Sequence, residues 1–201
     1  MKALFVIANP NPASFSHAMA DVAERELQSR GCAVIRHDLY AEGFDPVQRT
    51  GEAGNTRSDD ALVERHCAEL MQADLVLIFH PNWWSQPPAI LKGWVDRVFR
   101  LGTAYGYAPG VSPDGVPVGL LRARQALVFN TSNTPPERES AVFGDPLETL
   151  WRHSIFSLCG VHDVARLMVG PMAGSTAEQR SAWLADVAGL VSRAPFNETS
   201  S

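Results

Sequence analysis

The sequence predicts a three-layer α/β domain, in which one parallel sheet is covered by helices on both faces. Five short apolar runs alternate with five helical patterns, which is the order of a parallel sheet. The chain has 201 residues, enough for one well-packed domain. Apolar residues make up 45% and charged residues 19%, as in globular proteins. We expect a single domain over residues 1–194 and a disordered tail at residues 195–201.

Each predicted strand is a continuous apolar run that ends at polar or turn-forming residues. Runs of this kind are typical of strands that are buried on both faces of a sheet. The strands are expected at residues 3–8, 32–37, 73–79, 125–129 and 163–169. Right-handed crossovers join parallel strands in such folds, and we expect a doubly wound sheet of order 2-1-3-4-5.

The helical patterns lie between these runs, at residues 17–29, 59–72, 90–100, 146–159 and 176–193. Ser58 precedes the second pattern and is expected to cap it. Ser175 and Thr176 stand at the start of the last pattern, and Glu178 is placed for a capping arrangement with them. The polar segment 38–57 is longer than most connections in compact domains, so a functional or an interfacial role is open.

The stretch 78–100 organises the predicted site. It joins the end of the third strand, an aromatic loop with Trp83 and Trp84, and a helix start after Pro87 and Pro88. Loops that leave the carboxyl ends of parallel strands are where open α/β folds bind ligands. We expect this loop to form one wall of a binding site. Two loop tryptophans are also typical of core anchors or of a dimer surface.

The loops after the first, third and fourth strands would lie side by side at one sheet edge in this strand order. The first loop brings hydroxyls and backbone N–H groups to a helix start, an arrangement that attracts phosphate, although Ser14 or Ser16 could simply be a helix cap. The third, N-T-S-N-T at residues 130–134, is typical of a polar ring-binding loop or of an ordinary turn. The sequence contains neither a phosphate-binding G-x-x-x-x-G-K-[ST] loop nor G-x-G-x-x-G.

Charge and cysteine content exclude several function classes. A net charge of −5 and a pI near 5.6 offer no general attraction to nucleic acid or to anionic lipid, so we expect no nucleic-acid partner. No apolar stretch reaches the roughly 18 residues of a membrane helix, and membrane insertion is not expected. The three scattered cysteines indicate reduced, buried thiols and a cytoplasmic location.

The histidines show no ligand spacing, and no metal is expected. His17 and His80 flank predicted strand or helix ends, where a general acid or base could sit, but a lone histidine is more often a satisfied structural residue. His37, His66, His153 and His162 are far apart in the sequence. No G-x-S-x-G elbow supports a serine hydrolase.

Several motifs together resemble one known family. Residues 88–99 read P-A-I-L-K-G-W-V-D-R-V-F after H-P-N-W-W. Four further motifs occur along the chain in the matching order: A-S-F-S-H-A-M at 13–19, D-L-Y at 38–40, A-Y-G-Y at 104–107 and C-G-V at 159–161. This set resembles the flavodoxin-like NAD(P)H:quinone oxidoreductases, the DT-diaphorase and modulator-of-drug-activity group. The resemblance covers about residues 1–190 and implies a flavodoxin-like fold.

The resemblance also implies a flavin, FAD or FMN, over the carboxyl edge of the sheet, with NAD(P)H as co-substrate and a quinone-like acceptor. Tyr105 and Tyr107 would act near the nicotinamide or quinone, reaching the flavin of a partner subunit in a homodimer, and the helix 90–100 with Trp94 and Phe99 would carry part of the dimer contact. The residues implied to hold the flavin are Asn9, Ser14, Phe15 and Ser16 at its phosphates, Pro81, Asn82, Trp83, Trp84 and Ser85 along the isoalloxazine, and Thr131, Ser132, Asn133 and Thr134 at its pyrimidine side.

The chain departs from this family in the third loop. The family pattern T-T-G-G reads T-S-N-T here, no tyrosine follows, and Phe143 falls where the family has a catalytic histidine. Our first hypothesis is a flavin-dependent NAD(P)H oxidoreductase that reduces quinones or related acceptors by ping-pong hydride transfer. The alternatives are a flavin-binding ancillary subunit of an ion-efflux system and a one-electron flavodoxin-type carrier, although the modest charge argues against the carrier.

Overall fold

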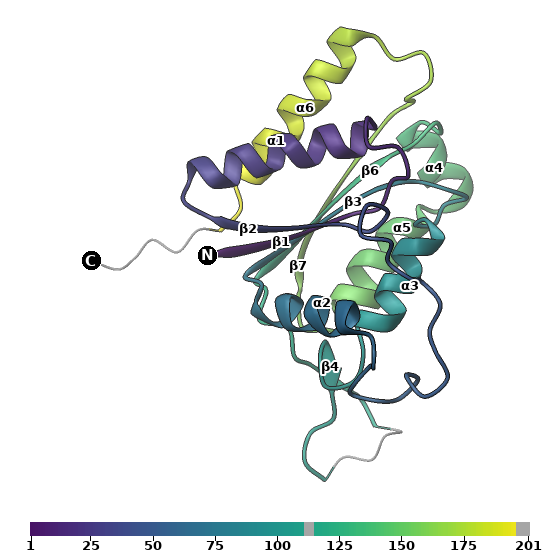
Figure 1. The fold of residues 1–201 in the computed structure, drawn as a ribbon. Helices are drawn as coiled ribbons and strands as arrows, with labels where there is room; N and C mark the ends of the chain where they lie inside the picture. The colour runs from purple at the N-terminus through teal and green to yellow at the C-terminus, as the bar shows by residue number, and fades with distance from the viewer. Residues whose placement is uncertain (111–114, 196–201) are drawn as a thin grey trace.

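The computed structural model describes residues 1–110 and 115–195, and it confirms the predicted fold class and strand order. Five parallel strands form the central sheet in the order β2-β1-β3-β6-β7 (Figure 1). Their bounds are β1 Lys2–Ile7, β2 Ala33–Asp38, β3 Leu75–Pro81, β6 Gln125–Thr131 and β7 Asp163–Val169. Residues 196–201 of the expected disordered tail lie outside the described residues.

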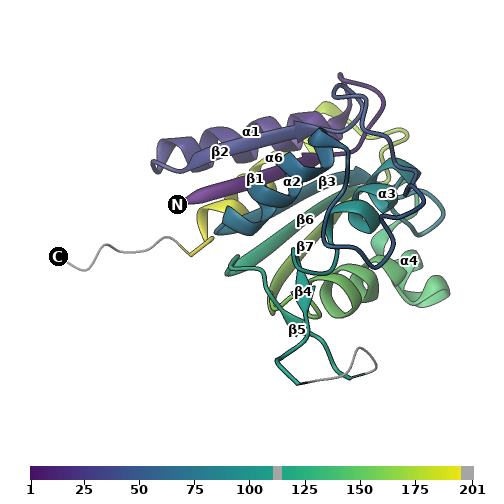
Figure 2. The same ribbon diagram turned by 60° about the horizontal axis from the view of Figure 1, so that its bottom comes forward.

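Two hydrophobic cores lie on opposite faces of the sheet, because successive side chains of a strand point to opposite sides. Phe5 and Ile7 of β1 pack against α1 (Phe15–Ser29) and α6 (Ala177–Ser192) on one face. Leu4 and Val6 pack on the other face, which is covered by α2 (Ala61–Gln72), α3 (Ala89–Val98) and the π-helical segment η1 (Thr149–Phe156). The three layers are visible in Figures 1 and 2.

Several local predictions were wrong. Asp60, not Ser58, caps α2, and its carboxylate accepts from the N–H of Leu62 at 3.0 Å. The capping partner of Thr176 is Gln179 rather than Glu178. The helix expected over residues 146–159 is split into α5 (Pro146–Glu148) and η1, and two further elements were not predicted. These are α4 (Pro136–Phe143) and a two-stranded ribbon of β4 (Tyr105–Gly106) and β5 (Val118–Gly119).

The long connection after β2 packs on the outside of α3. Gly93 lies under Pro46 so closely that a Cβ atom on Gly93 would stand 2.2 Å from the Pro46 carbonyl oxygen. One turn later, the buried guanidinium of Arg97 donates to both carboxylate oxygens of Glu52, at 2.9 and 2.7 Å, and to Asp60 at 3.1 Å. The pKa of Glu52 falls to about 2 because of these bonds from Arg97. The segment is therefore fixed to α3 by an ion network.

The expected dimer role of α3 is wrong for its two aromatic residues. Trp94 is completely buried and Phe99 is 8% exposed, and both belong to the core between the sheet and α2, α3 and η1. Their rings meet edge to face at 5.3 Å within the chain. Neither side chain is available to a second subunit.

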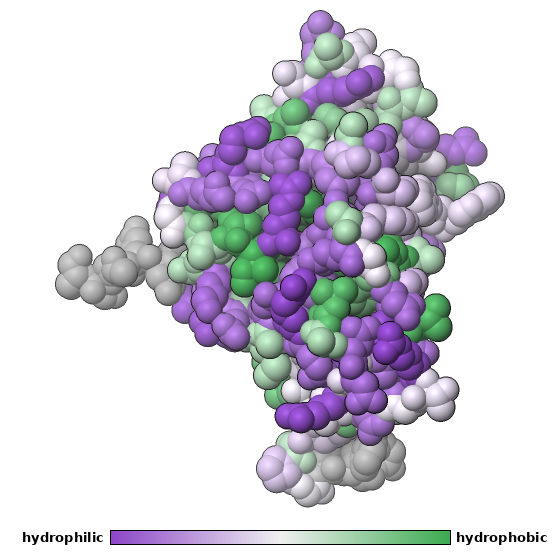
Figure 3. All heavy atoms as spheres, in the orientation of Figure 1, coloured by the Kyte–Doolittle hydropathy of each residue, from purple (hydrophilic) through white to green (hydrophobic). Residues whose placement is uncertain are grey.

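The visible surface is mainly polar (Figure 3) and the three cysteines are buried, as expected for a globular domain of this composition. The face in Figure 3 is mainly hydrophilic, with small separate hydrophobic groups. Among the described residues, no helix has both the length and the apolar content needed to cross a bilayer. Cys32, Cys67 and Cys159 are free and buried, as expected, and burial raises the pKa of the Cys159 thiol to about 12.

Candidate functional site

A hollow of about 720 Å³ opens at the carboxyl edge of the sheet, where β3 and β6 end side by side. Its volume is typical of pockets for organic cofactors and substrates. Nine of the predicted site residues come together in its wall, from the loops after β3 and β6. The lining residues are Pro81, Asn82, Trp83, Trp84, Ser85, Thr131, Ser132, Asn133, Thr134, Glu139, Phe143, Pro146 and Met172.

The loop after β3 closes in a tight two-residue turn. The backbone groups of Trp83 and Gln86 bond each other reciprocally, each at 3.0 Å. Between them Trp84 and Ser85 both have positive φ, 57° and 56°. Two successive left-handed residues are typical of a type I′ turn, which usually contains Asn and Gly. A residue other than glycine has a strained backbone in this left-handed conformation, and such strained residues are concentrated at functional sites.

The turn presents the two tryptophans unequally. Trp84 is 98% exposed and Trp83 is 43% exposed. A large apolar ring with almost no protein contact is available to cover a flat ligand in the pocket. The predicted alternative, that both tryptophans are core anchors, is wrong.

Glu139 is a pocket residue that the sequence analysis missed. It lies on α4, it is 1% exposed, and it accepts a hydrogen bond from the Ser85 hydroxyl at 2.5 Å. Phe143 lies one turn further along α4 and also lines the pocket, half-exposed. The only earlier signal was the acidic pattern in P-E-R-E after two prolines, which is more typical of an exposed helix start.

The loop after β6 is held by its neighbour after β7. The N–H of Ser132 donates to Val169 and its carbonyl accepts from Met172, both at 2.9 Å. Asn133 accepts from the N–H of Ala173 at 2.8 Å. Gly170 makes this approach possible, because a Cβ atom there would stand 2.2 Å from the Ser132 oxygen. The polar loop is thus positioned by a rigid frame before any ligand binds.

Asn82 offers an acceptor that the protein does not use. Its N–H donates to the Thr131 carbonyl at 2.6 Å, which joins the two loops. Its side-chain Oδ1 is buried and has no hydrogen-bond partner among the described residues. Because buried polar atoms are normally paired, this oxygen indicates a donor supplied by a ligand or by water.

The loop after β1 lies at the same edge but does not line this pocket. Ser14 caps α1, which starts two residues earlier than expected, so Phe15 and Ser16 are in its first turn. Ser16 is buried and its hydroxyl accepts from the Asn9 amide at 3.3 Å. Phe15 packs edge to face on Trp183 of α6 at 6.0 Å. The groups that remain for an anion are the N–H groups of the first helical turn and the half-buried Ser14 hydroxyl.

His17 supports that hydroxyl from behind. Its Nδ1 lies 2.8 Å from the Ser14 Oγ and its Nε2 lies 2.8 Å from an Asp38 oxygen. The other Asp38 oxygen accepts from the N–H groups of Tyr40 and Ala41. His17 therefore links the start of α1 to the end of β2, and it is not in the pocket.

Tyr105 lies in β4 and Tyr107 follows it; this ribbon projects from the bottom of the domain in Figure 1, away from α4. Both are half-buried, and neither lines the pocket of its own chain. A role beside a flavin therefore requires a second copy of the chain.

His80 has both ring nitrogens bonded inside the protein. Nδ1 donates to the Pro81 carbonyl at 2.8 Å, and Nε2 accepts from the Trp151 indole at 3.1 Å. The side chain is completely buried, which lowers its pKa to about 4. His80 is a structural residue, and it does not reach the pocket.

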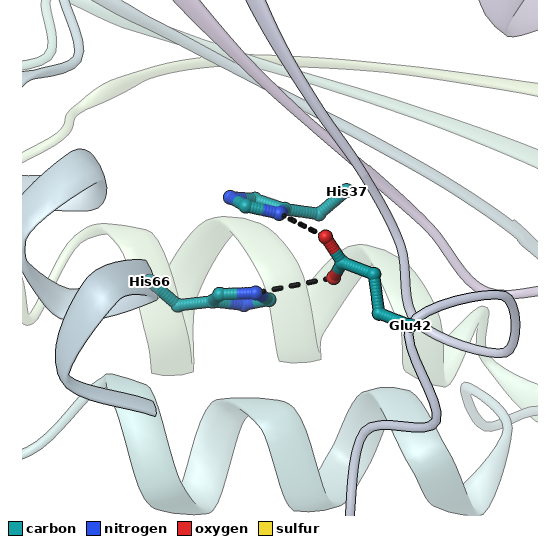
Figure 4. A group of neighbouring side chains, drawn as sticks. All are labelled: His37, Glu42 and His66. Carbon is teal, nitrogen blue, oxygen red and sulfur yellow. Dashed lines mark hydrogen bonds and ion pairs between the residues drawn. The ribbon is translucent and has the colours of Figure 1, made fainter. Parts of the chain in front are cut away.

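A second histidine cluster lies outside the pocket, under the long connection (Figure 4). His37 and His66 were treated separately in the sequence, but their rings stack with centroids 3.7 Å apart. Glu42 lies between them, with oxygens 2.9 Å from His37 Nδ1 and 3.1 Å from His66 Nε2. The three groups are close enough to share a metal ion.

Trp94 argues against that role. Its indole N–H, which can only donate, bonds Nδ1 of His66 at 2.9 Å. Nδ1 is thus the acceptor, and the proton of the neutral ring is on Nε2, which leaves no lone pair there for a metal ion. His66 Nε2 and Glu42 Oε2 lie 3.1 Å apart, and neither atom has a hydrogen-bond partner among the described residues. The second nitrogen of His37 is bonded to Glu69 at 2.6 Å. We therefore interpret the cluster as structural.

Comparison with known proteins agrees with this fold. The Flavodoxin-like fold family matches residues 1–190. The chain belongs to this flavodoxin-like family. Among its relatives, ribosyldihydronicotinamide dehydrogenase [quinone] of Rattus norvegicus is 33% identical over 210 residues, covering 92% of this chain and 87% of that protein. An uncharacterized NAD(P)H oxidoreductase of Haemophilus influenzae is 34% identical over 82% of this chain and 81% of its own length.

The fold also superposes on solved structures over nearly the whole chain. Smu.1420 from Streptococcus mutans superposes with a TM-score of 0.82 at 31% identity, covering 96% of this chain and 99% of that one. An NAD(P)H:quinone oxidoreductase from Methanothermobacter marburgensis also superposes with a TM-score of 0.82, covering 96% of this chain and 96% of that one. Its sequence identity is 22%, so this similarity shows the fold alone. This flavodoxin-like chain therefore has NAD(P)H quinone oxidoreductases as its relatives.

Proposed function

We propose that this protein is a flavin-dependent NAD(P)H oxidoreductase that reduces quinones or related acceptors. The observation that carries the proposal is the pocket at the carboxyl edge of the sheet. Two polar loops and an exposed tryptophan surround this pocket, which is large enough for a flat ring system. The relatives named as a ribosyldihydronicotinamide dehydrogenase [quinone] and as an NAD(P)H oxidoreductase support the same class of reaction.

The lining fits an isoalloxazine ring. Such a ring needs apolar planes against its faces and small polar groups along its pyrimidine edge. Trp83 and Trp84 supply planes, and residues 131–134 supply hydroxyl, amide and backbone groups. The unpaired Oδ1 of Asn82 is an acceptor for a ring N–H. FMN and FAD both carry this ring, and the proposal covers both.

The phosphates of the flavin would bind at the start of α1. The first helical turn leaves backbone N–H groups unbonded, and the helix dipole favours negative charge there. Ser14 adds a hydroxyl at the same place. In this arrangement Asn9 and Ser16 shape the loop through their mutual hydrogen bond, and Phe15 fixes it to α6.

The flavin, when bound, accepts a hydride from the nicotinamide and passes it to the second substrate. The protein contributes position: the bonds between the loops after β3, β6 and β7 hold the polar groups, and the strained turn holds Trp84 over the pocket. One hollow serves both substrates in turn, so NAD(P)+ must leave before the quinone enters. Ping-pong turnover follows from this sharing.

We also propose that the active form is a homodimer in the cytoplasm. The β4–β5 ribbon carries Val116, Val118 and Leu120, which are 85%, 44% and 44% exposed, and Leu158 beside it is 44% exposed. Contact of this apolar surface with a second copy would bring Tyr105 and Tyr107 toward that copy's flavin. Light scattering at micromolar concentration tests it, and a protein that stays monomeric with full activity contradicts the dimer.

The proposal is tested by reconstituting the protein with FMN or FAD and adding NADPH or NADH without oxygen. Bleaching of the flavin's visible absorption band, followed by recovery on addition of menadione, is the expected result. Heat release of the bound cofactor from the purified protein, followed by chromatography, identifies the flavin. A protein that binds neither flavin, or whose flavin is reduced by neither nicotinamide, contradicts the proposal.

A further inference from the structure

Glu139 is the only ionisable side chain in the wall of the pocket among the described residues. Every other lining residue is an apolar, hydroxyl or amide side chain. Glu139 is also only 1% exposed, although it belongs to a helix that otherwise buries no side chain. Burial of a carboxyl group costs free energy, so its presence in the pocket wall suggests a functional role.

Ser85 connects this carboxyl group to the open part of the pocket. Its hydroxyl donates to Glu139 Oε1 at 2.5 Å, while Ser85 itself is half-buried and lines the hollow. A hydroxyl can accept and donate at the same time, so it can pass a proton on. Its place in the left-handed turn, with φ of 56°, fixes the backbone of Ser85 at the pocket wall.

We propose that Glu139, through the Ser85 hydroxyl, supplies the proton that accompanies hydride transfer in this pocket. The inference rests on the proposed function. Reduction of a quinone by NAD(P)H moves two electrons and one proton as hydride and takes one further proton, giving NAD(P)+ and hydroquinone. In this step the Ser85 hydroxyl turns from donating to Glu139 to accepting from the protonated carboxyl group. The Glu139 O–H bond breaks as its proton passes to Ser85 Oγ, and the Ser85 O–H bond breaks as its own proton passes to the acceptor oxygen. Glu139 is then reprotonated from solvent.

The charges around Glu139 are few. The loops after β3, β6 and β7 contribute no charged side chain to the pocket wall among the described residues. On α4 itself the neighbours are Glu137 and Arg138, which lie on its outer side. Asp145 follows the helix, and its carboxylate is paired with Arg166 of β7.

The test compares wild type with Glu139→Gln and Ser85→Ala in the flavin-loaded protein. The amide oxygen that E139Q introduces can still accept the hydrogen bond from Ser85, so this variant preserves the turn but has no acidic proton to give. S85A keeps the carboxyl group but breaks the connection. The flavin is reduced with one equivalent of dithionite and mixed with menadione in a stopped-flow instrument across a range of mildly acidic to mildly alkaline pH.

We expect reoxidation of wild type to slow toward high pH and to show a solvent deuterium isotope effect. In E139Q and S85A the rate should fall about a hundredfold, the usual contribution of a general acid, and lose this pH dependence. The flavin Kd of E139Q, measured separately by fluorescence titration of the apoprotein, should stay close to that of wild type. For S85A the Kd is measured so that any weaker flavin binding is separated from the rate. S85A also serves if E139Q does not fold.

Two results would overturn the inference. One is a variant with the wild-type rate and pH profile; the other is a rate loss that a weaker flavin Kd fully explains, which would assign Glu139 to ring binding or structure. Dithionite replaces NAD(P)H in this assay, so a failure of nicotinamide to reduce the flavin contradicts the proposed function without affecting the readout for Glu139.

Discussion

The indole N–H of Trp94 donates to Nδ1 of His66 at 2.9 Å, and both side chains are completely buried. The same relationship recurs between η1 and β3, where Trp151 donates to Nε2 of His80 at 3.1 Å. In each pair the tryptophan requires a ring nitrogen without a proton. Both histidines are therefore held neutral by a donor as well as by burial, which lowers their pKa values to about 3 and about 4.

The first prediction concerns stability in acid. Because the folded-state pKa values lie below the ordinary histidine value of 6.5, unfolding takes up protons, and the stabilisation is complete above that pH and is lost as pH falls toward 3 to 4. In that pH window each histidine should lower the free energy of unfolding by up to about 1.4 kcal/mol for every pH unit of acidification. Urea unfolding at about pH 7.5 and about pH 5 measures it, on either side of the ordinary histidine pKa.

Each histidine has a substitution that keeps the hydrogen-bond acceptor for its tryptophan partner. His66→Asn keeps an acceptor where Nδ1 was, and His80→Gln keeps one where Nε2 was, but neither titrates. The loss of stability between the two pH values should be smaller in each variant than in wild type. An unchanged pH slope in both would contradict the assignment.

A second prediction concerns the ion network that fixes the long connection to α3. Arg97→Met leaves Glu52 buried without its partner, and it should cost about 3–5 kcal/mol of the free energy of unfolding. Since the pKa of Glu52 is lowered to about 2, its stabilising effect is present above about pH 4.5 and is lost as pH falls toward 2. Trypsin should then cut the variant at Arg49 or Arg57 faster than wild type. Equal cleavage rates would show that the segment is held by other contacts.

A third prediction uses two helical glycines as a matched pair. Gly93→Ala should destabilise by more than about 2 kcal/mol, because the new Cβ atom would stand 2.2 Å from the backbone of Pro46. Gly189→Ala in α6 would meet only the flexible end of Arg193, at 3.6 Å, and should gain up to about 1 kcal/mol from helix propensity. Thermal unfolding measures both. Similar effects of the two substitutions would be evidence against the tight contact at Gly93.

A fourth prediction tests the exposed tryptophan. Trp84→Ala should leave the free energy of unfolding nearly unchanged, because the side chain is 98% exposed, but it should weaken flavin binding about tenfold, the value of one aromatic stacking contact. Val47→Ala, at a site that is 67% exposed and away from the pocket, is the control. Fluorescence titration with FMN and FAD gives the Kd. Equal Kd values for W84A and wild type would remove Trp84 from the ring wall.

The sheet could be predicted from the sequence because its inner strands β1, β3 and β6 are buried on both faces, which leaves continuous apolar runs such as the one that ends at His80. Helix α4 could not, because its one buried residue is the carboxylate Glu139 and it therefore has no apolar stripe. The cap of α2 was misplaced by two residues, because Ser58 and Asp60 are both good caps and the hydroxyl of Ser58 is used by Glu52.

The site was predicted in part for a related reason. The loops after β3 and β6 follow directly from the strand order, and the structure brings their residues together in one wall. The contacts of Glu139 with Ser85, 54 positions apart, and of His66 with His37 depend on packing between distant elements. No local pattern in the sequence encodes such contacts.

The anchoring of α4 has a consequence for how tightly any ligand can bind. Most helices are held by the apolar area that they bury, but α4 is joined to the pocket through the bond between Glu139 and Ser85. Such a helix opens locally at a small cost, so its amides should exchange with solvent faster than those of α1 or α3. Part of the binding free energy of a ligand in contact with Phe143 is then spent in ordering this helix, and measured affinity will understate the strength of the contacts themselves.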